Sequence, residues 1–100
     1  MAQKPETIFR KKAMDKFNEL PYSAWMSIQQ KVITASPDVI GCVNGAFVSL
    51  EFKKDRHSKP TELQNYKKEK IQMARGRAFI IYPENFDQVF AIVSEIANEI

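Results

Sequence analysis

The dipeptide Asn44-Gly45 lies between two apolar runs, and it restricts the fold more than any other feature of the chain. Asn-Gly favours the two-residue turn that joins neighbouring antiparallel strands, because both residues tolerate positive φ angles. The sequence therefore predicts a β-hairpin whose strands cover residues 38–43 and 46–53 or 46–54. If Asn44 and Gly45 form the loop, the pairing of all other positions in the hairpin follows.

This register predicts a cluster of charged side chains. Asp38 should lie directly opposite Glu51, with the two Cβ atoms about 5 Å apart. Lys53 should emerge on the same face, because side chains alternate along a strand, while Phe52 points the other way into the core. Two opposed carboxylates destabilise a sheet, and burial would force one of them to take up a proton. A purely structural role therefore explains the two acids poorly.

A divalent cation would remove the conflict between Asp38 and Glu51. Mg²⁺ takes oxygen ligands, and it commonly uses one or two carboxylates together with water and phosphate oxygens. The Lys53 ammonium could then orient or help deprotonate an attacking water, or stabilise charge that develops on the phosphate. The cluster therefore predicts a Mg²⁺ site, in which Mn²⁺ could substitute, for phosphodiester hydrolysis.

A structural interpretation of the three charges remains open. Asp38 follows Pro37 and could be only a turn or strand-entry residue. Glu51 could pair with Lys53 or with a lysine on a neighbouring strand. On that view the protein is a small, non-catalytic basic α/β module that binds nucleic acid or a protein partner, and the cluster is an ion-pair network.

The remaining segments predict an α/β domain with the order α-β-β-β-α-β-α. Apolar spacing, Pro positions and β-branched runs predict helices over residues 5–20, 60–74 and 86–100, and further strands over residues 23–34 and 77–83. Both hairpin strands are apolar on both faces, so we expect the sheet to lie between two helix layers. A length of 100 residues fits a single domain over 1–100.

The distribution of charge favours a polyanionic partner. The segment 53–77 carries nine lysines and arginines against three acids, whereas 78–100 has no lysine or arginine. Basic surfaces of this kind suit nucleic acid, although solvated lysine faces are also common. The chain lacks an apolar run long enough to cross a membrane and lacks a signal-peptide pattern, so the sequence predicts a cytoplasmic protein without a membrane partner.

Several other classes of site find no support in the sequence. The single cysteine, Cys42, cannot form an internal disulfide or build a zinc site, and we expect it to be a small apolar filler. His57 is the only histidine, and the chain has no activated serine elbow and no phosphate-binding Gly-rich loop. A hydrolytic triad and a nucleotide-hydrolysing site are therefore disfavoured.

The residues "SPDVIG", the hairpin and "EFK" together resemble the Pro-Asp…Glu-x-Lys pattern of the PD-(D/E)XK nuclease superfamily. The following "KPTELQ" is similar to a Thr-x-x-Gln at the helix start in the virus-type replication-repair nuclease (VRR-NUC) domain. The resemblance covers Glu6 to about Pro83. It implies a restriction-endonuclease-like αβββαβ core, with a central mixed sheet flanked by helices and, here, an extra C-terminal helix. One departure is Ser36, where the family commonly has Gly.

The resemblance also implies roles for particular residues. Asp38, Glu51 and the backbone carbonyl of Phe52 would bind the metal, and Lys53 would be the catalytic lysine. Gln64 would lie beside the site and contact Lys53 or substrate. A further ligand would come from the first helix, where Glu6 is favoured over Glu19, although Glu6 could instead only favour the helix dipole.

The basic segment would contact phosphates and position DNA without reading its sequence. These contacts are expected from the loop after the Glu-x-Lys strand and from the following helix: Lys54, Arg56, His57, Lys59, Lys67, Lys68 and, less directly, Lys70. The resemblance predicts a structure-specific DNA endonuclease of the small type that phages encode, acting in the host cytoplasm on branched DNA such as Holliday junctions. A homodimer would carry two active sites, with Trp25, Met26 or Phe86 as candidate contacts. A nuclease fold without activity is a third possibility.

Overall fold

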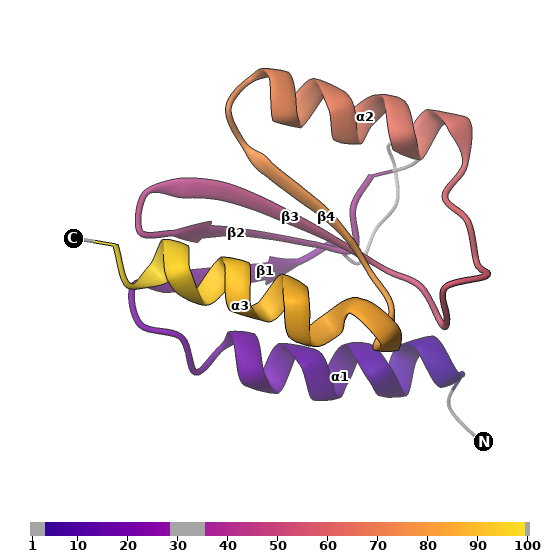
Figure 1. Cartoon of the computed structure of the whole chain (residues 1–100), viewed down its shortest axis with the longest axis horizontal. Coiled ribbons are helices and arrows are strands. Elements are labelled where there is room, and N and C mark those ends of the chain that lie inside the picture. The colour runs from indigo at the N-terminus through magenta and orange to yellow at the C-terminus, as the bar shows by residue number, and fades with distance from the viewer. Residues whose placement is uncertain (1–3, 29–35, 100) are drawn as a thin grey trace.

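A four-stranded mixed sheet lies between two helix layers in the computed structural model, which describes residues 4–28 and 36–99 (Figure 1). The sheet order is β1-β2-β3-β4; β1, β2 and β3 pair antiparallel, and β4 runs parallel to β3. The elements are α1 (Pro5–Phe17), β1 (Ser23–Ser27), β2 (Val39–Val43), β3 (Ala46–Phe52), α2 (Glu62–Met73), β4 (Arg77–Ile81), the 3₁₀ turn η1 (Pro83–Asn85) and α3 (Phe86–Ala97). The predicted fold class and element order are confirmed.

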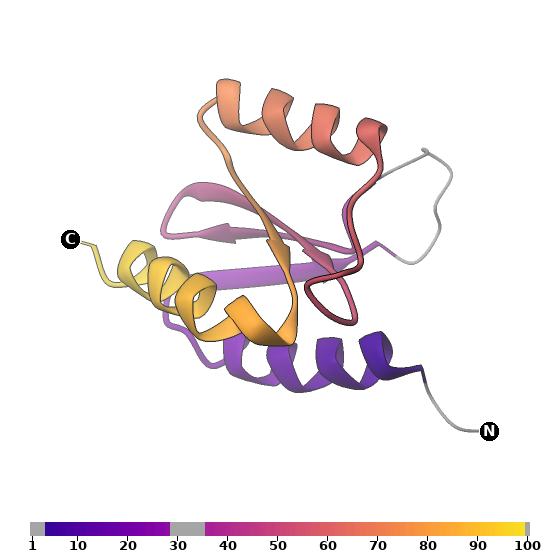
Figure 2. The ribbon, with the colours of Figure 1, turned by 45° about the vertical axis from the view of Figure 1, so that its right-hand side comes forward.

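The helices are divided unequally between the two faces of the sheet. Helices α1 and α3 lie together on one face, and α2 lies on the other (Figures 1 and 2). The face toward α1 and α3 holds the core, and its largest fully buried side chains are Phe17, Val39, Val43, Val48, Leu50, Ile81 and Val93. Trp25 also packs on this face, where its ring lies so close to Gly41 that a Cβ at that position would collide with it.

The hairpin has the predicted register. Val43 pairs with Ala46, and the pairing continues without a break to Val39 and Leu50. Asn44 and Gly45 have φ angles of 48° and 87°, as a two-residue turn of this type requires. The Asn44 side-chain amide also donates to the carbonyls of Ile96 and Glu99, and this fixes the turn to the end of α3.

Several element boundaries differ from the sequence prediction: β2 begins at Val39 rather than residue 38, β3 ends at Phe52 rather than 53 or 54, and α3 ends at Ala97 rather than 100. Further differences are found in α1, α2 and β4. Helix α1 ends at Phe17 rather than residue 20: the N–H groups of Glu19 and Leu20 donate to carbonyls three residues back instead of four, so the chain leaves α-helical geometry before it reaches Pro21. Pro60 precedes α2, whose N-cap is Thr61. Strand β4 ends at Ile81 because Pro83 begins a 3₁₀ turn. The first predicted strand is confirmed from Ser23 to Ser27, and its residues 29–34 lie outside the described part of the chain.

The outer face of β1 and β2 is more exposed than predicted. Helix α2 packs against β3 and β4, and among the described residues no helix covers the outer face of the first two strands. Cys42 is therefore exposed rather than a buried filler, and Phe47 and Met26 are 44% and 65% exposed. Apolar residues on both faces of a strand predicted two covered faces, but a single helix is only about 10 Å wide, and α2 lies over β3 and β4, which are about 4.8 Å apart.

No helix in the described ranges is long and apolar enough to cross a membrane.

Candidate active site

Asp38 lies just before β2, where its carboxylate is fixed against β3. Its Oδ2 accepts a hydrogen bond of 2.8 Å from the Phe52 backbone N–H, and its side chain is only 14% exposed. In an extended strand, the N–H and C=O groups of one residue point toward the same neighbouring strand. The Phe52 carbonyl, a predicted metal ligand, therefore faces the side on which Asp38 lies.

Counted outward from the turn, the last regular pair of the hairpin is Val39 with Leu50, so Asp38 lies just outside the ladder. Its N–H donates to the carbonyl of Leu50 at 3.1 Å, one residue away from the partner that the hairpin register would give it. Such a shift, as in a β-bulge, re-aims a side chain at a strand end. The predicted opposed pair of Asp38 and Glu51 is thus not part of the ladder. Asp38 instead reaches the end of β3 through Phe52, the residue that follows Glu51.

Glu51 and Lys53 lie at the same end of β3, and Gln64 of α2 connects them. The Lys53 Nζ donates to Gln64 Oε1 at 3.2 Å, and the Gln64 Nε2 donates to Glu51 Oε2 at 3.4 Å. Lys53 Nζ lies 4.0 Å from Glu51 Oε2, and the two side chains are 16% and 14% exposed. The structure therefore brings together three of the four predicted catalytic residues by direct contacts.

The start of α2 explains why Gln64 is held in this position. Thr61 and Gln64 form a capping box: the Thr61 side chain accepts from the Gln64 N–H, and Gln64 Oε1 accepts from the Thr61 N–H at 2.9 Å. One amide oxygen thus serves both the helix cap and Lys53. The Thr-x-x-Gln spacing is itself a capping signal, so sequence reasoning could have found this role for Thr61.

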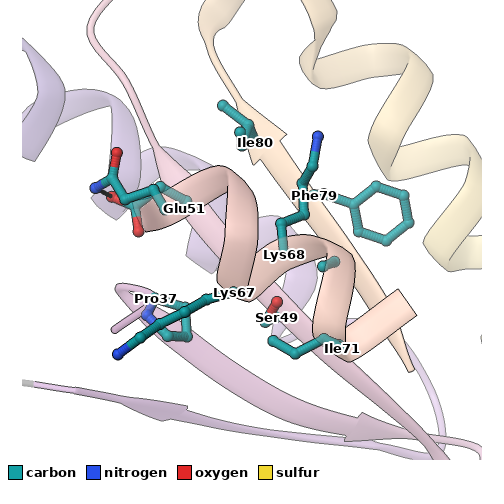
Figure 3. A pocket seen from close by; sticks show the side chains of 10 residues that line it. Pro37, Ser49, Glu51, Lys67, Lys68, Ile71, Phe79 and Ile80 are labelled. Atoms are coloured by element: carbon teal, nitrogen blue, oxygen red, sulfur yellow. Dashed lines mark hydrogen bonds between the residues drawn. The ribbon is translucent and has the colours of Figure 1, made fainter. Parts of the chain in front are cut away.

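A small pocket lies beneath α2 beside these residues (Figure 3). Its volume is about 30 Å³, which is the space of a single water molecule. Glu51, Gln64 and Lys67 line it together with Ser49, which is 4% exposed. The enclosed part is too small for a nucleotide, so a substrate would have to bind at the open end of β3.

Arg10 is a site residue that sequence reasoning missed. Its Nη1 lies 4.0 Å from Asp38 Oδ1, so the first half of α1 approaches the candidate site. Glu6 is one turn before Arg10 on the same helix face, whereas Glu19 lies beyond the end of α1 and about two and a half turns from Arg10. Along α1, Glu6 is therefore closer than Glu19 to the residue that contacts Asp38. The i, i+4 spacing of Glu6 and Arg10 was the sequence feature that could have drawn attention to Arg10.

The carboxylates do not form a complete metal site by themselves. Among residues 4–28 and 36–99, no three His, Cys, Asp or Glu side chains are grouped so that they could hold an ion, and Glu6 is therefore not gathered with Asp38 and Glu51. The available donors are two carboxylates and a backbone carbonyl. This all-oxygen set is of the kind that Mg²⁺ uses when water and substrate phosphate complete its coordination.

The predicted DNA contacts lie next to the site. Lys54, Arg56, His57 and Lys59 follow β3 directly, and Lys67 and Lys68 are on α2. The loop is organised by Asp55, whose carboxylate accepts from the N–H groups of His57 and Ser58. The His57 hydrogen bond lowers the pKa of Asp55 below its ordinary value. The ionised Asp55 carboxylate therefore stabilises the loop at every pH above the pKa that this group has in the unfolded chain. This stabilisation is lost only as the pH falls through the lower pKa of the folded protein, so the loop remains ordered at neutral pH.

A solved structure described as "VRR_NUC domain" is similar to the chain over 89% of its length and 97% of the other, with a TM-score of 0.77 and 20% sequence identity. This likeness confirms that the chain has the fold of that domain. No family model matches the sequence, and no curated protein matches it.

Proposed function

We propose that this protein is a metal-dependent endonuclease that hydrolyses phosphodiester bonds in branched DNA. The observation that supports this most is the position of Lys53. Its ammonium is held by Gln64 and lies beside Glu51, at the strand end where Asp38 is fixed by the Phe52 N–H. A lysine beside one acid, with a second acid held against the same end of β3, is a suitable arrangement for positioning a phosphate and water.

Each residue has a separate task in this proposal. Asp38, Glu51 and the Phe52 carbonyl would hold Mg²⁺ or Mn²⁺, which when bound supplies a positive centre for the phosphate and lowers the pKa of water. Lys53 donates hydrogen bonds to the attacking water or to a phosphate oxygen, where negative charge develops. Gln64 keeps the ammonium in place, because its oxygen is itself fixed by the α2 cap. Arg10 balances the charge of Asp38.

The preference for branched DNA and a homodimer are parts of the same proposal. Within residues 4–28 and 36–99, no helix resembles one that reads bases, whereas the basic loop after β3 can bind phosphates. Two copies related by a two-fold axis could cut both strands of a four-way junction. Of the suggested contacts, Met26 is 65% exposed on the uncovered sheet face, but Trp25 and Phe86 pack against Phe17 on the core side.

Cleavage of labelled DNA tests the function. The protein is incubated with a four-way junction, a flap and a plain duplex, in Mg²⁺ or Mn²⁺ and in chelator. We expect metal-dependent cleavage of the junction and the flap in preference to the duplex. Asp38→Asn is expected to bind the junction without cutting it. Binding by the parent with no cleavage in either metal would contradict the proposal and favour the non-catalytic binding module.

Metal binding can be measured apart from cleavage. In the parent, Mn²⁺ at tenfold excess over its Kd should add about 1.4 kcal/mol of stability, which raises the Tm by roughly 6–11 °C for a chain of this size. In Glu51→Gln, most of this increase should be lost because the ion loses a ligand. Glu95→Gln is a matched control, since Glu95 is exposed on α3. Equal Tm shifts in the parent and in Glu51→Gln would exclude Glu51 as a ligand.

A further inference from the structure

A long open groove follows strand β4 between α2 and α3. Strand β4 forms one edge of the sheet and passes between the two helices (Figure 1). Two cavities of about 460 Å³ and 560 Å³ lie along it, and both are lined by Ala78, Phe79 and Ile92. We call their combined lining the β4 groove. It is far larger than the pocket beneath α2, and the metal-site proposal does not use it.

The side chains around the β4 groove are basic. The first cavity is lined by Arg56, Lys59 and Lys68, and the second by Arg75 and Arg77. Neither lining contains an aspartate or a glutamate. Among the described residues, no carboxylate forms an ion pair with any of these five cations. The charge of the groove therefore suits a polyanion.

The β4 edge is poorly suited to accept another strand. The Ala78 carbonyl already accepts from Gln72 Nε2 at 3.4 Å, and the Ile80 carbonyl accepts from Asn85 Nδ2 at 3.0 Å. An added peptide strand would have to displace both side-chain amides. The same two hydrogen bonds partly neutralise carbonyl oxygens that would otherwise repel a phosphate. The occupant that fits is thus an anionic chain rather than a β-strand.

The β4 groove is continuous with the candidate active site. The Lys53 N–H donates to the Ile81 carbonyl at the end of β4, and Ala78, Phe79 and Ile80 line both the first cavity and the pocket that holds Glu51. Arg77, at the other end of β4, is four residues from Ile81, or about 13 Å. Phe79, whose ring is visible beside β4 in Figure 3, is half-buried and packs partly against the core, and Tyr82 is also half-buried. Both line the first cavity and add aromatic surface beside its cations.

We infer that the β4 groove binds one single strand of nucleic acid and leads it away from the site of cleavage. Cationic side chains would contact the phosphates, and Phe79 and Tyr82 would stack with bases, which only an unpaired strand can offer. This inference rests on the proposed function only for the direction of the strand. The binding itself requires neither metal nor cleavage, so the two proposals can fail separately.

Fluorescence anisotropy in chelator tests the groove with a labelled oligothymidylate of about 12 nucleotides, which is within the usual site size. The test variant is Arg75→Asn with Arg77→Gln; Asn suits position 75 because its φ is 73°. Loss of two phosphate contacts should weaken binding by about tenfold at low salt and make the slope of log K against log salt shallower by about 1.4. The control, Lys11→Gln with Lys12→Gln, removes the same charge from exposed positions on α1, neither of which lines the β4 groove. It should change affinity by less than about twofold.

Two results would overturn the inference. The first is an equal loss of affinity in the test and control pairs, or an unchanged salt slope in the test pair. The second is full displacement of the oligonucleotide by polyglutamate of the same length, because stacking should favour the nucleic acid. Binding that depends on Arg75 and Arg77 without any cleavage in Mg²⁺ would support the groove and refute the nuclease. Cleavage by the parent, together with unchanged oligonucleotide binding in the test pair, would support the nuclease and refute the groove.

Discussion

Lys53→Ala is expected to lower kcat for DNA cleavage by about 10³-fold, the usual cost of removing a group that transfers a proton or stabilises charge in a transition state. Lys53 is held beside Glu51 by Gln64, at the end of β3. Truncation removes the ammonium but leaves Gln64 bonded to the Thr61 N–H, so the cap of α2 remains. Single-turnover cleavage of a labelled junction measures the rate constant of the cleavage step separately from product release, and steady-state cleavage gives kcat.

Lys54→Ala is the matched control for this variant. Lys54 is the next residue, carries the same charge and is exposed in the loop after β3. We expect it to raise the apparent Kd for the junction about two- to fivefold, as the loss of one phosphate contact should, with kcat unchanged. If both variants lose kcat equally, or if Lys53→Ala cuts like the parent, Lys53 is not a catalytic residue.

The sequence was sufficient to predict the hairpin, its register and the convergence of Glu51 and Lys53 on one end of β3. These features are local, since they follow from the Asn44-Gly45 turn and the alternation of side chains. The position of Gln64 was also within reach, because Thr-x-x-Gln forms a capping box that places residue 64 one turn into α2. Short-range chemistry thus defines most of the candidate site.

Features that depend on how whole elements pack could not be predicted in this way. The contact of Arg10 with Asp38 depends on the position of α1 beneath the sheet, and the exposure of Cys42 depends on how far α2 extends over it. The β4 groove depends on the parallel return of β4 after α2, which leaves this strand at the edge. The shift of hydrogen bonding at Asp38 was hidden for a different reason, because a bulge carries no fixed sequence signal.

The largest expected effect on stability belongs to Phe17, which joins α1 to both the sheet and α3. Its side chain is fully buried, and its ring lies 5.3–5.7 Å from the rings of Trp25, Phe86 and Phe90. Phe17→Ala should cost about 3–5 kcal/mol, from lost apolar burial and from the cavity left behind. That is a large part of the 5–15 kcal/mol that holds a typical domain together. Urea unfolding followed by circular dichroism gives the difference.

Phe47→Ala provides the comparison, because it removes the same atoms from the uncovered face of the sheet. Phe47 is 44% exposed, so the truncation should cost less than about 1.5 kcal/mol. A similar loss in the two variants would mean that the outer face is as well packed as the core, contrary to the arrangement of helices around this sheet. A small loss at Phe17 would mean that α1 contributes little to the fold. Helix α1 could then not hold Arg10 beside Asp38, and the role given to Arg10 in the site would fail with it.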